Sequence, residues 1–222
     1  MIEHYMIEPA RFKLDGGAMY GIIPKPLWNK VHPADELNRV DLALRLWLIK
    51  TANRVILVDT GIGDYHGSTF DQRFDVQGGE NPINQALSSL SLSTDDITDL
   101  VISHLHFDHV GGIGIKNAQG EMTPVFKNAT CHVHQQHYEY ALKPTDRDTG
   151  SFHRQIFEPI LEHYRKDNKL TLYQGEEGLL FDLEDNVPLS FKCSFGHTPW
   201  LMHPYTPTVS YTHLTLPTKR IV

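Results

Sequence analysis

Apolar runs of strand length recur along this chain. Residues 42–50 and 54–59 are two runs rich in apolar and β-branched side chains, and the short polar link between them predicts a strand pair. Four shorter apolar runs predict further strands, at residues 100–103, 129–134, 170–173 and 189–195.

Helices are expected between these strands. Apolar residues in the segment 157–166 follow the i, i+3, i+4, i+7 spacing of one helical face. Residues 81–90, which begin with Asn-Pro, and residues 135–142 are expected to be helical as well. A strand pair followed by strands that alternate with helices is typical of an α/β protein whose helices pack on sheets.

The composition fits a single globular unit. The chain has 222 residues, of which 40% are hydrophobic and 21% charged, as in ordinary globular proteins. Because no repeat or linker divides it, we expect one domain over residues 1–209. Residues 210–222 resemble translated sequencing-adapter read-through, and a non-native tail and a final strand at 211–216 both stay open for them.

Charge and cysteine content limit the partners. A formal charge of −7 does not supply the positive surface that nucleic-acid binding requires, and the two cysteines cannot build a disulfide framework. The first residues lack the basic and apolar regions of a signal peptide, and the apolar stretch 42–49 is too short to cross a bilayer. We expect a cytoplasmic protein with a small-molecule substrate and no membrane or nucleic-acid partner, with a homodimer left open.

Metal-ligand residue types cluster directly after the predicted strand at 100–103. His104, His106 and Asp108 alternate along the chain, so an extended backbone places them on one side, and His109 follows at a turn made by residues 111–112, both glycine. Imidazole and carboxylate are ligands of borderline-soft divalent ions such as Zn²⁺. The cluster therefore predicts a site for one or two zinc ions, and Fe or Mn would accept the same ligands.

The run His104-Leu105-His106-Phe107-Asp108-His109 resembles the HxHxDH signature of the metallo-β-lactamase fold hydrolases. The segments 58–61 (Val-Asp-Thr-Gly) and 195–199 (Phe-Gly-His-Thr-Pro) are also similar to that family, so the resemblance covers most of the chain. Residues 24–28, Pro-Lys-Pro-Leu-Trp, resemble its lactonase and organophosphate-hydrolase branch. The resemblance implies a four-layer αβ/βα sandwich, here expected to lack its last strands and helix.

The resemblance also implies ligand roles. His104, His106 and His197 would bind a first metal ion, and Asp108 with His109 would begin a second site. The local sequence also makes His197 a candidate ligand, because it follows a predicted apolar strand, as His104 does.

The family places an aspartate behind the ligands, here Asp59, where a carboxylate can accept the N–H of a ligand histidine. A turn-forming role in Asp-Thr-Gly is the alternative for Asp59.

The sequence departs from the family downstream of His197. Only 25 residues follow it (222 minus 197) and none is acidic, so the family's metal-bridging aspartate has no counterpart there. Trp200 stands where many relatives have glycine. We expect neither His203 nor His213 to replace the missing ligands.

Other candidates carry less chemistry. His132, His134 and His137 could form a second metal group, but no carboxylate follows at ligand spacing, and packing or surface roles are expected. A substrate pocket lined by apolar aromatic rings is expected next to the metal residues. Its proposed lining residues are Trp28, Phe107 and Trp200.

Three functional hypotheses follow. The leading one is a metal-dependent hydrolase in which a metal-bound hydroxide attacks an ester, lactone, related carbonyl or phosphoester. The resemblance to the family implies that Asp108 would orient the hydroxide and return a proton to the leaving group. The second is iron-dependent oxygen or thiol chemistry on the same fold. The third is a truncated, non-catalytic fragment that binds one metal weakly or none and exposes unpaired sheet edges.

Overall fold

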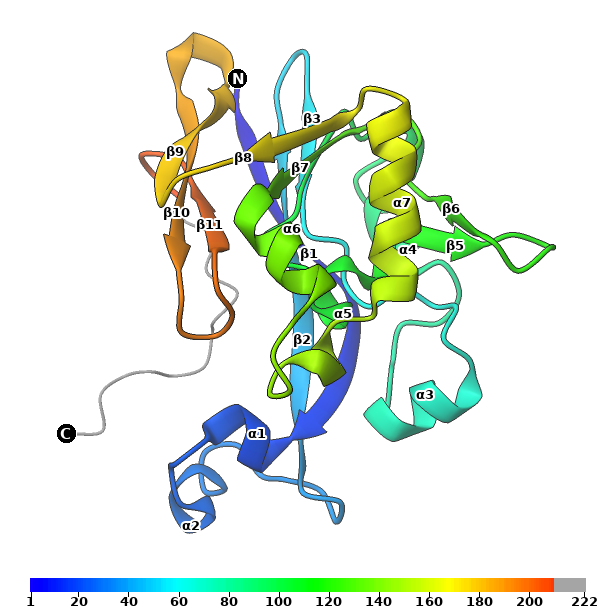
Figure 1. The fold of residues 1–222 in the computed structure, drawn as a ribbon, viewed down its shortest axis with the longest axis vertical. Coiled ribbons are helices and arrows are strands. Elements are labelled where there is room, and N and C mark those ends of the chain that lie inside the picture. Colours follow the sequence, from blue (N-terminus) through cyan, green and yellow to red (C-terminus); the bar gives the residue numbers. More distant parts are fainter. Residues whose placement is uncertain (210–222) are drawn as a thin grey trace.

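A computed structural model describes residues 1–209 (Figure 1). The predictions for residues 210–222, including the final strand and His213, lie outside the described residues. Within the described part, no helix has the length and apolar content that a membrane crossing requires. The α-helices are α1 (Gly16–Tyr20), α2 (Lys25–Trp28), α3 (Ser68–Phe74), α4 (Pro82–Ser88), α5 (Phe107–Val110), α6 (Gln135–Leu142) and α7 (Arg154–Lys166).

A six-stranded mixed sheet forms the centre of the molecule. Its order is β1 (Glu3–Asp15), β2 (Arg39–Lys50), β3 (Val55–Val58), β4 (Asp99–Val101), β7 (Thr130–His134) and β8 (Leu170–Tyr173). The pairs β1–β2 and β2–β3 are antiparallel, and the strands from β3 to β8 are parallel. The carboxyl ends of β3, β4 and β7 therefore meet at one edge of the sheet.

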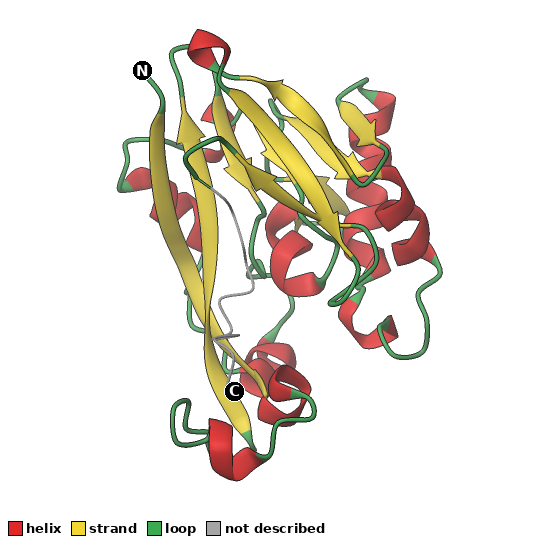
Figure 2. Cartoon of the chain, turned by 90° about the vertical axis from the view of Figure 1, so that its left-hand side faces the viewer, coloured by secondary structure: helices red, strands yellow, loops and turns green. Residues whose placement is uncertain are grey.

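Two smaller sheets complete the strands. The three-stranded antiparallel sheet has the order β11 (Leu201–Tyr205), β10 (Pro188–Ser194) and β9 (Glu177–Asp182). A short hairpin joins β5 (Gly114–Lys116) to β6 (Met122–Pro124). Figure 2 shows the three-stranded sheet facing the central sheet, with α6 and α7 on the other side of the central sheet.

The central strands are buried on both faces. Leu46 and Leu48 point into a core shared with α7, whereas Trp47 and Ile49 point into a second core shared with the three-stranded sheet. This alternation follows from the two-residue period of a strand. It explains why residues 42–50 read as a nearly continuous apolar run.

The predicted α/β architecture is confirmed, with layers of helix, sheet and sheet in residues 1–209. Among these residues, none forms a helix on the outer face of the three-stranded sheet (Figures 1 and 2). The predicted strand pair is β2 and β3, and the predicted helices are α4, α6 and α7. The 13-residue strand β1 was not predicted.

A buried ionic group anchors the start of β4. The Asp99 carboxylate accepts hydrogen bonds from Arg54 Nη1 at 2.8 Å to both oxygens, from Thr98 Oγ1 at 2.7 Å and from His132 Nε2 at 3.0 Å. Burial alone would raise the pKa of Asp99, but these donors outweigh it and hold the pKa below its usual value.

We expect Asp99→Asn to lower the free energy of unfolding by about 2 kcal/mol at pH 7, because charge-assisted hydrogen bonds to a buried carboxylate are lost. A group whose folded-state pKa is lowered stabilises the protein above its unfolded pKa, about 3.9 for Asp, and loses that contribution as the pH falls further. Urea denaturation at several pH values should show the difference between the two proteins shrinking below about pH 4. Equal stability at pH 7, or a difference that grows in acid, would contradict this account.

Candidate metal centre

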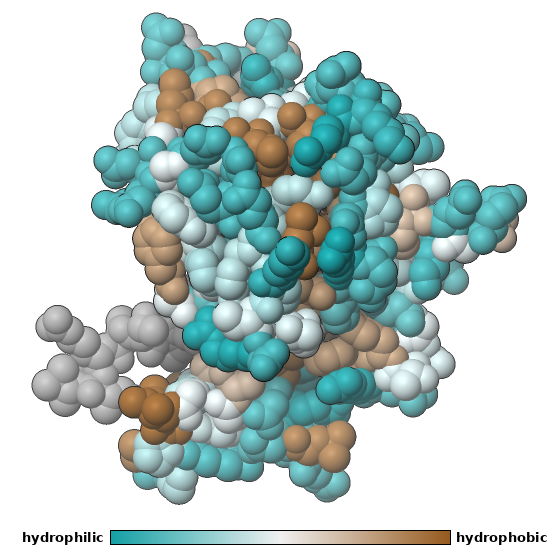
Figure 3. All heavy atoms as spheres, in the orientation of Figure 1, coloured by the Kyte–Doolittle hydropathy of each residue, from teal (hydrophilic) through white to brown (hydrophobic). Residues whose placement is uncertain are grey.

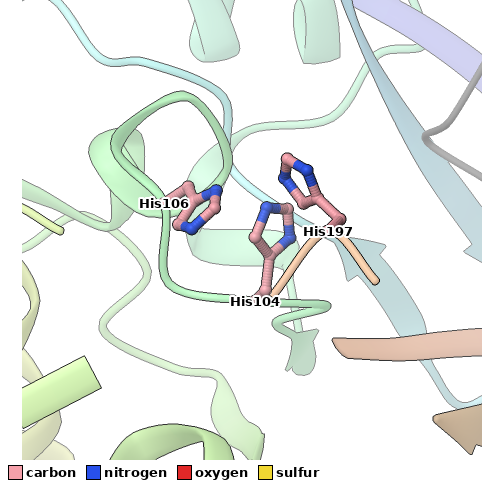
Figure 4. A group of neighbouring side chains, drawn as sticks. All are labelled: His104, His106 and His197. Carbon is pink, nitrogen blue, oxygen red and sulfur yellow. The ribbon is translucent and has the colours of Figure 1, made fainter. Parts of the chain in front are cut away.

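Three histidine side chains converge at the edge where the two sheets meet (Figure 4). His104 and His106 lie in the loop between β4 and α5, and His197 lies in the loop between β10 and β11. One ring nitrogen from each lies within 4.8 Å of the others. His104 and His106 are buried, while His197 is exposed. Two loops from different sheets therefore bring their imidazoles together.

Close backbone contact brings the first loop to this place. Gly111 and Gly112 follow α5, and a Cβ atom on them would come within 2.2 Å of the Ile62 carbonyl oxygen and 2.3 Å of the Thr60 carbonyl oxygen, respectively. Only glycine permits that approach. The segment after α5 can therefore pack directly against the loop after β3, which fixes the position of α5 and of the loop before it.

Asp59 holds the first loop from behind. It is fully buried at the end of β3 with a φ of 63°, a left-handed conformation that Asp adopts more readily than most residues. Its carboxylate accepts hydrogen bonds at 2.7 Å from both the backbone N–H and the hydroxyl of Ser103, and lies 2.8 Å from His109 Nδ1. Because a carboxylate only accepts, His109 donates to it through Nδ1.

The Asp59 carboxylate also orients His104, through Ser103. The Ser103 hydroxyl donates its only hydrogen bond to Asp59. It therefore accepts a hydrogen bond from the N–H at His104 Nδ1, 3.0 Å away. This tautomer makes Nε2 the lone-pair nitrogen of His104. Ser103 was not among the residues singled out from the sequence, because a serine beside a histidine carries no distinctive pattern.

Asp108 and His109 lie at the start and in the middle of α5, next to the three histidines. The ring centroids of His104 and His109 are 4.1 Å apart, and Asp108 Oδ2 is 3.5 Å from His109 Nε2. Burial lowers the pKa of His109, but the carboxylates of Asp108 and Asp59 outweigh that effect, and its pKa is raised. The structure therefore brings five of the proposed ligand residues and Asp59 into one region, and their ligand roles stay predictions.

His137 is a further buried residue at this centre. Its Nε2 lies 2.8 Å from the Leu105 backbone nitrogen, and its Nδ1 lies 2.7 Å from the Pro199 carbonyl oxygen. Burial lowers its pKa to about 4, which keeps the ring neutral at physiological pH. The sequence pattern favoured a packing or surface role for His137 and did not connect it with the ligands. Within the described residues, the histidines at 132, 134 and 137 form no metal-binding group with one another.

The aromatic residues proposed for a pocket lie in different places. Phe107 is buried beside His106, with its ring 4.9 Å from that of His153. Trp200 stacks on His134 at 5.1 Å, three residues after His197.

Trp28 is buried in α2, stacked on Tyr20 at 4.8 Å. The segment around it exposes other apolar side chains, such as Val31 and Leu37. Figure 3 shows hydrophobic residues at the surface of the end of the molecule that carries α1 and α2. The described contacts of Trp28 thus lie within its own segment, and its pocket role stays a prediction. Phe152, which has no distinctive pattern in the sequence, instead packs its ring 4.6 Å from that of His106.

The donor set fits a divalent metal ion. A catalytic zinc site usually has three protein ligands, such as neutral imidazoles, and a fourth position that is left for water. Desolvation also lowers the pKa of His197, which favours the neutral ring that a metal ion binds. His203 instead hydrogen-bonds to the Ser194 hydroxyl at 2.8 Å on the neighbouring strand.

Comparisons with known proteins identify relatives of this chain. Curated relatives include the N-acyl homoserine lactonase AttM of Agrobacterium fabrum, 26% identical over 183 residues that cover 82% of this chain and 59% of that protein. An N-acyl homoserine lactonase of Bacillus thuringiensis is 30% identical over 112 residues, which cover 46% of this chain and 41% of that protein. This chain thus spans less than two thirds of these relatives.

Solved structures share the fold. A probable metal-dependent hydrolase from Staphylococcus aureus superposes with a TM-score of 0.75 and 27% identity, covering 91% of this chain and 68% of that chain. The dizinc quorum-quenching lactonase AidC superposes with a TM-score of 0.63 and 21% identity, covering 94% of this chain and 69% of that chain. The family model described as "Metallo-beta-lactamase superfamily" matches residues 46–220. The chain belongs to the metallo-beta-lactamase superfamily.

Proposed function

We propose that this protein is a zinc-dependent hydrolase that opens an ester or lactone. The observation that carries the proposal is the convergence of His104, His106 and His197 from two loops that belong to different sheets. His104 and His106 are buried and pack ring to ring with each other and with the exposed His197, and polar rings gain less from such packing than aliphatic side chains would. A cation bound by all three imidazoles would stabilise this arrangement.

The chemistry expected at such a centre is hydrolytic. When bound, a divalent cation activates water as a nucleophile and polarises the carbonyl oxygen under attack. Three imidazoles suit Zn, Fe and Mn alike, so the donor set alone does not select the metal. The dizinc description of the structural neighbour AidC supports zinc.

The chain's own residues would orient and move the proton. Asp108 is the acidic side chain at the start of α5, half-buried beside His109. As a carboxylate it can accept a proton from the attacking water and return it to the departing alcohol oxygen. Asp59 and Ser103 hold the rings of His109 and His104 in fixed tautomers, so neither ring has to reorient during turnover.

The substrate class is proposed from the relatives together with the surroundings of His106. Both curated relatives described above carry the name N-acyl homoserine lactonase. The Phe152 ring lies 4.6 Å from that of His106, and an apolar ring in this place is expected where an apolar part of a substrate lies beside the reacting carbonyl. An N-acyl homoserine lactone is therefore the substrate to test before others.

His106→Ala should remove zinc binding and hydrolysis together. We expect kcat/KM for a lactone to fall at least about 100-fold, since losing even an outer partner of a metal ligand costs about 10–100-fold. Elemental analysis of the purified protein and a pH-indicator assay of lactone opening measure the two effects.

His163→Ala is the matched control, because His163 is an exposed histidine on α7 whose neighbour is Asp167. It should keep the metal content and the rate of the wild type. If His106→Ala also kept both, the proposal would be wrong. Iron in place of zinc in the wild-type protein would favour oxygen or thiol chemistry instead.

Asp59→Asn should weaken the metal centre without unfolding the protein. Asn tolerates the left-handed backbone at this position, but its amide replaces a carboxylate that accepts from three donors. We expect zinc affinity to fall about 10–100-fold in competition with a chromogenic chelator. Asp99→Asn removes another buried carboxylate outside the centre and should leave zinc affinity unchanged; equal affinities in all three proteins would rule out the orienting role of Asp59.

A further inference from the structure

We propose that His137 is a positioning residue that fixes the distance between the two metal-ligand loops. The inference rests on the proposed metal centre and concerns a side chain outside its ligand set. His137 lies in the first turn of α6, behind the histidine group, and is 1% exposed. Its ring lies between the loop that carries His104 and His106 and the loop that carries His197.

Both ring nitrogens of His137 are used, one for each loop. The Leu105 backbone N–H, between two ligand residues, can only donate, so Nε2 accepts from it at 2.8 Å. The Pro199 carbonyl, two residues after His197, can only accept, so Nδ1 donates to it at 2.7 Å. The two partners therefore require the neutral tautomer with the proton on Nδ1, from hydrogen-bond geometry alone.

The placement matters because His137 joins the backbones of the two loops, whereas the rings of His104 and His106 contact that of His197 only through side chains. One backbone hydrogen bond, from the Met202 N–H to the Ser103 carbonyl at 3.0 Å, also joins the two segments. That bond lies at the start of β11 and joins the three-stranded sheet to the segment directly after β4. The link through His137 instead reaches the peptide between His104 and His106 on one side and the turn after His197 on the other.

The rigid imidazole acts as a spacer of fixed length. The aromatic ring keeps its two nitrogens at a constant separation, and α6 together with the ring of Phe152, 5.8 Å away, holds it in place. A metal centre needs its ligands within a narrow range of separations, because misplaced ligands lower affinity. Removing the spacer should thus change the metal site more than the overall stability.

Two variants at this position separate the spacer from simple packing. His137→Leu fills the cavity but removes both hydrogen bonds, whereas the side-chain amide of His137→Gln can accept from Leu105 and donate to Pro199. His132→Gln is the matched control, since His132 is also a buried histidine but bonds to Asp99 and Tyr173. Zinc affinity is measured by chelator competition, and the ligand field by visible absorption of the Co²⁺-substituted protein.

We expect His137→Leu to lose at least about tenfold in zinc affinity and to change the Co²⁺ spectrum. His137→Gln should recover most of the affinity. His132→Gln should match the wild type in zinc affinity and in the Co²⁺ spectrum. Thermal unfolding without metal confirms that each variant is folded; if His137→Leu does not fold, His137→Asn, whose amide is too short to reach both partners, replaces it. Wild-type affinity and spectrum in the Leu or Asn variant would overturn the inference alone. Absence of zinc and cobalt binding by the wild type would overturn the proposed function and this inference with it.

Discussion

The metal centre depends on one constraint, which is the meeting of two sheets at a common edge. Parallel strands β3, β4 and β7 end at the same edge of the central sheet, and that is where open α/β sheets usually place their functional loops. Asp59 follows β3, His104 follows β4, and His137 follows β7. The three-stranded sheet packs on the opposite face and adds His197 from the end of β10.

Several buried polar groups at this edge are linked by a connected series of hydrogen bonds. Asp59 accepts from Ser103 and His109, Ser103 accepts from His104, and His137 joins the peptide of Leu105 to the loop after β10. Such a network is costly when one member is missing, because the remaining groups lose partners in a low-dielectric environment. The same network sets the tautomers of His104 and His109 before any ion binds.

The sequence predicted the parts that have a local signature. Apolar runs predicted β2, β3 and β8, and α6 has the predicted bounds, because buried strands and helix faces impose a period on the residues. The strand β1 was missed because its apolar residues form no continuous run, and Pro9 lies where its register with β2 shifts between Ile7 and Ala10.

The candidate site was predictable where ligand residue types cluster in the sequence. It was not predictable where a residue acts through hydrogen bonds to distant parts of the chain. The motif at 104–109 and the family resemblance together selected the histidines that converge. Ser103 and His137 act through hydrogen bonds to a side chain or to peptide groups that lie far away in the sequence, and such partners leave no pattern in a single chain. The pocket residues were the least predictable, because ring contacts such as that of Phe152 with His106 depend on tertiary packing.

Anomalous diffraction at the zinc edge from a crystal of the zinc-loaded protein tests the central claim most directly. The account predicts an anomalous peak about 2.1 Å from a ring nitrogen of each of His104, His106 and His197. A peak bound by the first two rings without the third, or no peak between the two loops, would contradict it.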